Sequence, residues 1–301
     1  MKNAINYYYG LNPEEIHQIN KIYKFQIQNY NYILEPFKRD MQELSEIYKL
    51  HEFIFQSGYY CHKIVLNNNN QIITNINGIN YIMLQTFAEN RKITINDIML
   101  FNSIYVQQKE LNRIKRENWY NLWMNKTDYV EYQINQFGKK YPLIRESSDY
   151  FIGIVENCIS MLSSIGQQNS IITVAHARTT INTTLHEYLN PTGFIIDNRV
   201  RDVSEYFKSC ILNQIDVIEK IMQYIYGNKL NIYEINLLFI RILYPSYYLD
   251  MCENIIEGIT EEKNLNQILD KVEATEQSIK KIYMQLRGIA NLPEIEWLIK
   301  K

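Results

Sequence analysis

The residues best suited to chemistry lie around two short apolar runs in the middle of the chain, Ile171–Val174 and Phe194–Ile196. His176 follows the first run and Asp197 follows the second. A carboxylate at the end of a buried strand can hold Mg²⁺, and an imidazole can move a proton near neutral pH. Arg178 stands in the loop between them, and its guanidinium stays protonated and suits anions. The pattern indicates the layout of a catalytic loop, with Asp197 as the candidate metal ligand.

This layout is that of kinase-type phosphotransferases. In such enzymes a loop Asp accepts the substrate proton, an Asn binds metal, and a second strand delivers a Mg²⁺-binding Asp. Small-molecule kinases of the aminoglycoside phosphotransferase type usually carry the motif HGDxxxxN in this loop. Here His176 and Ala177 precede Arg178 at the base position, and Thr183 takes the Asn position, one residue after Asn182. Arg cannot accept a proton, and loss of a general base costs about 10²- to 10⁴-fold in rate. The sequence therefore predicts a scaffold that binds rather than turns over a substrate.

Each of these residues also has a structural interpretation. Asp197 can accept backbone N–H bonds at the end of its strand, and His176 can be a structural loop residue. Arg178 can clamp a phosphate or carboxylate ligand, or it can pair with Asp197 and replace the charge of the metal. Asp202 resembles the helix Asp that hydrogen-bonds the catalytic loop in kinase folds, which is a structural task. We therefore expect no catalytic residue among the degenerate loop positions, which are His176, Arg178, Asn182 and Thr183.

Composition narrows the class of protein. With 31 basic and 33 acidic residues, the net charge of -2 supplies no broad field for a polyanion, so nucleic acid is not an expected partner. The four cysteines are spaced singly, without the close pairs of zinc or redox motifs, and indicate buried thiols in a reducing compartment. No run approaches the roughly 20 apolar residues of a transmembrane segment, and the first residues lack the apolar core of a signal peptide. A globular, cytoplasmic protein is expected.

The surrounding elements predict an α+β, protein-kinase-like fold with two lobes. Residues 1–88 are expected to form a small antiparallel β lobe with one helix, and residues 89–301 a large, mainly helical lobe. The strands expected in the first lobe are Ile22–Ile27, Tyr30–Leu34, Cys61–Leu66, Gln71–Ile76 and Ile79–Leu84. Asn77-Gly78 predicts a tight hairpin between the last two.

Helices are predicted from residue 94 onward. Thr94 and Asp97 resemble a capping pair, and Ser147 or Ser148 is the expected N-cap of a helix that Gly166 ends. Further helices are expected over 203–226, over 232–243 and through a long terminal stripe from 265 to 286. No linker rich in Gly, Ser or Pro divides the chain, so the two lobes are expected to form one unit.

The small lobe lacks the usual phosphate-binding residues. A kinase covers the phosphates with a Gly-rich turn and sends a Lys from its third strand, braced by a helix Glu. Gly10 is the only glycine before the first expected helix, and Glu35 ends the strand where a Lys is expected. Glu43 or Glu46 can take the bracing position without its partner. We therefore expect no confident cofactor-binding residue.

The chain resembles the endospore coat-associated proteins of the YutH type, relatives of the CotS coat proteins within the aminoglycoside and choline phosphotransferase superfamily. The tracts that carry the resemblance are 146–158, Phe194–Asp197 with Arg201–Tyr206, and Arg241–Tyr248. The match extends in order over nearly the whole chain. It implies a kinase-like fold, a sporulation role in a Gram-positive spore former, and synthesis in the mother-cell cytoplasm before assembly onto the coat with other coat proteins.

Three hypotheses remain open at this point. The first is a catalytically inactive pseudokinase that acts in coat assembly and needs no cofactor. The second is an active phosphotransferase that uses Mg-ATP on a small alcohol or amine. The third is a sensor that binds an anionic metabolite at Arg178.

Overall fold

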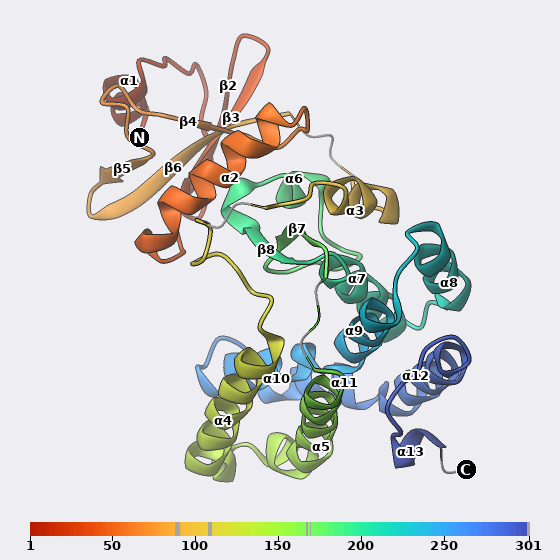
Figure 1. Ribbon diagram of the computed structural model, residues 1–301. Coiled ribbons are helices and arrows are strands. Elements are labelled where there is room, and N and C mark those ends of the chain that lie inside the picture. The colour runs from red at the N-terminus through yellow and green to blue at the C-terminus, as the bar shows by residue number, and fades with distance from the viewer. Residues whose placement is uncertain (88–90, 108–109, 167, 169, 300–301) are drawn as a thin grey trace. The chain divides into compact units, whose positions relative to one another are not determined.

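The computed structural model describes residues 1–87, 91–107, 110–166, 168 and 170–299 (Figure 1). Contacts divide the chain into two compact units, each built from two stretches of chain. The first unit comprises residues 1–115 and 172–197, and the second comprises 116–171 and 198–301. The predicted lobe boundary at residue 88 stays a prediction. By contacts, the central strands near Asp197 belong with the amino-terminal sheet.

A six-stranded antiparallel sheet forms the centre of the first unit, in the order β1-β2-β3-β6-β4, with β5 also pairing with β6. Its strands are β1 (His17–Ile19), β2 (Ile22–Ile27), β3 (Tyr30–Pro36), β4 (Lys63–Val65), β5 (Ile73–Ile76) and β6 (Ile79–Thr86). Asn77 and Gly78 have φ angles of 53° and 81°, which a two-residue hairpin turn requires, and the predicted hairpin is confirmed. β1 is additional to the predicted strands.

Helices cover both faces of this sheet (Figure 1). Met83 of β6 packs in a cluster with Ile5 of α1 (Lys2–Tyr9), a helix that the sequence patterns did not indicate. Leu84, the next residue, packs on the opposite face in a cluster that includes Tyr48 of α2 (Leu44–Gln56). The sheet therefore buries alternate residues of β6 on opposite sides.

Two central strands complete the first unit. β7 (Ile172–His176) and β8 (Phe194–Asn198) pair with each other, and α6 (Leu185–Tyr188) and a 3-10 turn, η3 (Pro191–Gly193), lie between them in sequence. The strands also bond to the segment after α3 (Ile95–Asn102): the Val106 N–H donates to the Ile172 carbonyl at 3.0 Å. Likewise, the Ile196 N–H donates to the Ile114 carbonyl at 3.0 Å.

The second unit is helical over its described residues. Its main helices are α4 (Trp119–Phe137), α5 (Pro142–Ile165), α7 (Arg201–Leu212), α8 (Ile218–Gly227), α9 (Ile232–Leu243), α10 (Ser246–Ile256) and α12 (Val272–Arg287), with the short α11 (Asn266–Leu269) and α13 (Glu296–Ile299). Among the described residues, no helix is both long and apolar enough to cross a membrane. The antiparallel small sheet and the larger helical part confirm the predicted fold class.

Three helix boundaries differ from the prediction. α5 begins at Pro142 rather than at Ser147 or Ser148, because proline suits the first helical turn, where its missing N–H is not needed. Ser147 lies inside the helix and donates to the Leu143 carbonyl at 2.7 Å. Gly166 ends the helix with a φ of 64°, as predicted.

The helix predicted over 203–226 is two helices, α7 and α8, and the terminal stripe is likewise divided into α11 and α12. Gln214, the residue after the C-cap Asn213, adopts a left-handed φ of 58°, and this ends α7. The apolar spacing continues across both breaks, so periodicity alone indicated single helices.

Candidate functional site

His176 is held by aromatic packing at the end of β7. Its Nε2 lies 2.8 Å from the Tyr188 carbonyl, and its ring stacks on the Tyr188 ring at 3.7 Å between centroids. A carbonyl oxygen can only accept, so Nε2 carries the proton of this contact. Phe101 and Phe194 meet the imidazole edge-on, and only 3% of the residue is exposed. This environment orients the ring against the protein interior.

Arg178 and Asp197 differ in their exposure to solvent. Arg178 is exposed, and its Nη1 donates to the Ala177 carbonyl at 3.2 Å. Asp197 is completely buried in β8. The ion pair between Arg178 and Asp197 and the binding of Mg²⁺ by Asp197 both stay predictions.

The two candidate positions for the metal-binding Asn take part in loop hydrogen bonds. The Asn182 Oδ1 accepts a hydrogen bond from the Lys92 Nζ at 2.7 Å. The Thr183 Oγ1 accepts a hydrogen bond from the Thr180 N–H at 2.9 Å. A Mg²⁺ ion would need the same Asn182 oxygen, and the Lys92 ammonium beside it opposes a second cation.

Glu35 stands near the end of β3, where a kinase carries its phosphate-binding Lys. Its Oε1 accepts a hydrogen bond from the Asn190 Nδ2 at 2.8 Å and lies 3.4 Å from the Thr192 hydroxyl. The carboxylate therefore ties β3 to the η3 turn that leads into β8. Charge and contacts both differ from those of a phosphate-binding lysine.

Arg39 makes a second connection to the same turn. Its Nη1 donates to the Phe194 carbonyl at 2.5 Å and to the Thr192 carbonyl at 3.2 Å. Its Nε pairs with Glu43 at 2.7 Å. Together with Glu35, this arginine fixes the start of β8 by side chains from the β3–α2 region. No local sequence pattern indicated these contacts, because they join residues more than 150 positions apart.

The candidate bracing residues of α2 have other partners. Glu43 pairs with Arg39, as described above. Glu46 is 9% exposed, and its Oε2 accepts the N–H groups of Arg113 at 2.8 Å and Ile114 at 3.2 Å. Through these contacts both carboxylates stabilise the local fold.

Two histidines pack beside α6 in the first unit. The ring centroids of His62 and His186 lie 4.3 Å apart, and the backbone N–H of His62 donates to the Leu189 carbonyl at 2.8 Å. His62 is fully buried, and neither ring nitrogen has a hydrogen-bond partner among the described residues. Burial, with the neighbouring His186 imidazole adding to it, lowers the pKa of His62 to about 3. Both imidazoles are therefore neutral at physiological pH, because burial also lowers the pKa of His186.

Asp202 lies in the first turn of α7 in the second unit and is 1% exposed. The same helix carries Glu205, whose Oε1 accepts from the Arg241 Nε at 2.6 Å and from the Lys208 Nζ at 3.0 Å. Burial by itself would raise the pKa of Glu205, but the charges of Lys208 and Arg241 hold it well below the ordinary value. Arg241 also lies over the Trp119 ring at 4.9 Å. Two of the tracts singled out in the sequence thus meet in one buried charge cluster.

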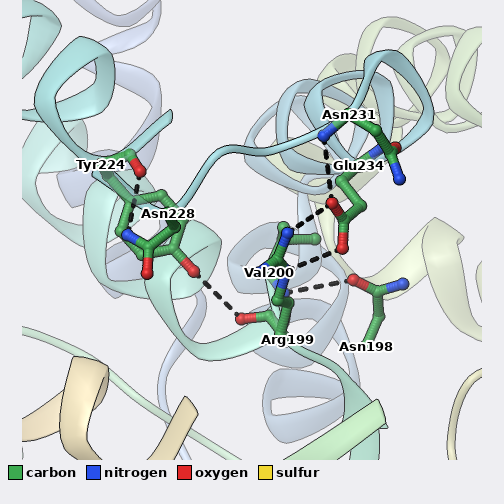
Figure 2. A network of polar contacts seen from close by, with 7 residues as sticks. All are labelled: Asn198, Arg199, Val200, Tyr224, Asn228, Asn231 and Glu234. Atoms are coloured by element: carbon green, nitrogen blue, oxygen red, sulfur yellow. Dashed lines mark hydrogen bonds and ion pairs between the residues drawn. The ribbon is translucent and has the colours of Figure 1, made fainter. Parts of the chain in front are cut away.

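A polar network follows β8 directly (Figure 2). The Arg199 guanidinium binds both carboxylate oxygens of Glu234, at 2.7 and 2.6 Å. Asn231 and Glu234 cap α9 reciprocally through backbone N–H bonds of 2.9 and 3.1 Å. The Tyr224 hydroxyl donates to the Arg199 carbonyl at 3.3 Å. Sequence reasoning missed this network, although Asn231 three residues before Glu234 is a capping signal.

Among the described residues, no group of three or more His, Cys, Asp or Glu side chains is arranged to hold a metal ion. The four cysteines are free and buried, as the sequence predicted.

Solved structures define the class of fold. An aminoglycoside phosphotransferase from Alicyclobacillus acidocaldarius superposes with a TM-score of 0.67 at 8% identity, covering 96% of this chain and 97% of that one. A spectinomycin phosphotransferase in its AMP-bound complex superposes with a TM-score of 0.60 at 12% identity, covering 94% of this chain and 96% of that one. A choline kinase from Streptococcus pneumoniae superposes with a TM-score of 0.55 at 14% identity, covering 92% of this chain and 97% of that one. The chain therefore has the fold of kinase-like small-molecule phosphotransferases.

Within that class the family is also clear. Residues 2–286 match the family described as spore coat putative kinase YutH, and the chain belongs to it. A curated relative, the endospore coat-associated protein YutH of Bacillus subtilis (strain 168), is 23% identical over an alignment of 339 positions, which covers 100% of this chain and 98% of the relative. These findings confirm the resemblance predicted from the sequence tracts.

Proposed function

We propose that this protein is a catalytically inactive, kinase-like component of the spore coat that acts in coat assembly through its surface. The observation that carries the proposal is the exposed Arg178 at the position of the catalytic base. A guanidinium accepts no proton at any accessible pH, so proton abstraction from a substrate hydroxyl has no acceptor there.

The phosphate side of the site supports the same conclusion. Glu35 replaces the expected lysine, and it is hydrogen-bonded to Asn190. A carboxylate repels a triphosphate, and its contact with the η3 turn gives it a structural task in the absence of nucleotide. We therefore propose that the fold needs no Mg-ATP cofactor. Asp197, retained in β8, favours the alternative of an active phosphotransferase.

The family relationship supports the proposed location and partners. We propose synthesis in the mother-cell cytoplasm, followed by assembly onto the coat through contacts with other coat proteins. A fluorescent fusion expressed in a sporulating host should concentrate around the forespore and remain with the coat fraction of purified spores. Recovery solely from vegetative cytosol would contradict this location.

Catalysis is tested by incubating the purified protein with γ-labelled ATP, Mg²⁺ and a panel of small alcohols and amines. We expect no labelled product and no rise in melting temperature with Mg-ATP, because a ligand that binds only the folded state would stabilise it. Asp197→Ala is the matched control. Labelled product from the unmodified protein that Asp197→Ala abolishes would establish the enzyme alternative. Stabilisation by non-nucleotide anions that Arg178→Ala removes would support an anion sensor instead.

A further inference from the structure

A cavity of about 700 Å³ opens at the α8–α9 loop of the second unit. Ile225, Leu230 and Ile235 are buried and provide an apolar floor, while Tyr226 and Ile232 are exposed at its edge. Small-molecule sites typically enclose about 300–1,000 Å³, with a mainly apolar lining and a few polar groups. The cavity has a volume in this range and a mainly apolar lining, and it is wide open to solvent.

One cation lies among the described lining residues. Lys229 is exposed at the cavity and makes no ion pair within the described part of the chain. The carboxylate of Glu234, nearby on α9, is neutralised by both arms of Arg199. Burial raises the pKa of Tyr233, and the Glu117 carboxylate adds to that rise, so this lining phenol stays neutral. The charge offered to a ligand is therefore the Lys229 ammonium.

The wall that carries Lys229 is held in place without a ligand. Figure 2 shows the Asn228 side chain bonded to Tyr224, and Asn231 bonded to Glu234, on either side of this lysine in sequence. Lys229 itself adopts a left-handed φ of 48°. A preformed wall lowers the ordering cost of binding.

We propose that this cavity binds a small amphipathic anion, an aliphatic or aromatic carboxylate. The apolar part rests on the apolar floor, and the carboxylate accepts a charge-assisted hydrogen bond from the Lys229 ammonium. The cavity does not include Arg178 among its lining residues, and the proposal is independent of whether the protein binds nucleotide or enters the coat.

The test uses hexanoate as the probe and methyl NMR of the full chain labelled at isoleucine. Hexanoate should shift the methyl signals of Ile225, Ile235 and Ile289 saturably. Hexanamide, which has the same apolar part without the charge, should bind about threefold to tenfold more weakly.

Two variants remove the cation. Lys229→Gly deletes the side chain and suits the left-handed backbone, so it is expected to fold, and Lys229→Gln keeps a side chain without charge. Both should weaken hexanoate binding about threefold to tenfold. Gln214→Gly is the matched control, because Gln214 also has a positive φ of 58° but does not line the cavity.

Three outcomes would overturn the proposal. The first is the absence of any saturable shift of these methyl signals at hexanoate concentrations up to about 10 mM. The second is equal affinity for hexanoate and hexanamide. The third is full hexanoate affinity in both Lys229 variants, or the same loss in Gln214→Gly.

Discussion

The Glu35 Oε1 accepts a hydrogen bond from the Asn190 Nδ2 at 2.8 Å, although 155 residues separate them in sequence. This carboxylate therefore supports the η3 turn before β8, at a strand position where a lysine is expected in an active kinase.

Glu35→Ala should loosen this turn. We expect a loss of about 1 to 2 kcal/mol in the free energy of unfolding, because the Asn190 amide loses a charge-assisted acceptor. Urea denaturation measures the loss, and hydrogen exchange should show faster opening over residues 190–197. Glu14→Ala, at an exposed position, is the control and should change neither. Unchanged exchange in Glu35→Ala would mean that Arg39 alone holds the turn.

The buried His62 should make the protein sensitive to acid. Its pKa of about 3 lies below that of a histidine in the unfolded chain, about 6.5, so the unfolded state binds the proton more readily. Stability is therefore fully present above about pH 6.5 and falls as the pH drops toward 3, by about 2 kcal/mol at pH 5 from this residue alone.

His62→Phe should flatten that pH dependence at little cost at pH 7.5, since neither ring nitrogen has a hydrogen-bond partner among the described residues. Urea denaturation at pH 5 and pH 7.5 measures both effects. His17→Phe, on an exposed strand, is the matched comparison and should leave the acid loss in place. An equal loss at pH 5 in His62→Phe and the unmodified protein would show that other groups cause it.

Glu234→Gln should be strongly destabilising. It keeps the shape of the side chain but leaves the Arg199 guanidinium, 11% exposed, without its carboxylate partner. Removing one partner of a buried pair typically costs about 3 to 5 kcal/mol. Thermal and urea unfolding of this variant, compared with Glu219→Gln on the exposed side of α8, provide the measurement. Combining it with Arg199→Met should cost less than the sum of the two single changes.

Gln214→Gly should stabilise the protein. Gln214 follows the end of α7 with a φ of 58°, and the Ile215 N–H bonds to the Cys210 carbonyl at 3.0 Å, as in a helix C-terminal cap. Glycine adopts this conformation without a steric penalty, so we expect a gain of about 0.5 to 1 kcal/mol. A melting temperature that stays the same or falls would contradict the assignment of strain to this residue.

Local signals in the sequence predicted much of the fold. Asn77-Gly78 specified its hairpin because the turn needs positive φ at both positions, and Thr94 with Asp97 specified a helix start because each side chain satisfies a backbone group of the other. Ser147 or Ser148 was the predicted start of α5, and this was wrong, because the helix begins at Pro142. Gln214 carries no sequence signal for the left-handed conformation that divides α7 from α8.

The candidate site was only partly visible in the sequence. The spacing predicts that Glu35 and Arg178 depart from the phosphotransferase pattern, and this stays a prediction. It could not reveal that Glu35 meets Asn190, because that contact depends on how distant segments fold together. The sequence likewise did not predict the cavity beside Lys229. Its apolar lining residues have the spacing of ordinary buried helix residues, and its polar ones are typical of a loop.

The first unit is assembled from two separated stretches of chain, and this has a consequence for its synthesis. β7 and β8 emerge from the ribosome only after the whole of α4 and α5 has been made, at about 5 to 20 residues per second. The Ile104 and Ile114 carbonyls accept hydrogen bonds from N–H groups of β7 and β8 in the folded protein. During those seconds the two carbonyls lack these donors. A nascent chain stalled before residue 172 should thus expose the unpaired backbone groups of the first unit, whereas a chain that also contains residues 172–197 should cover them.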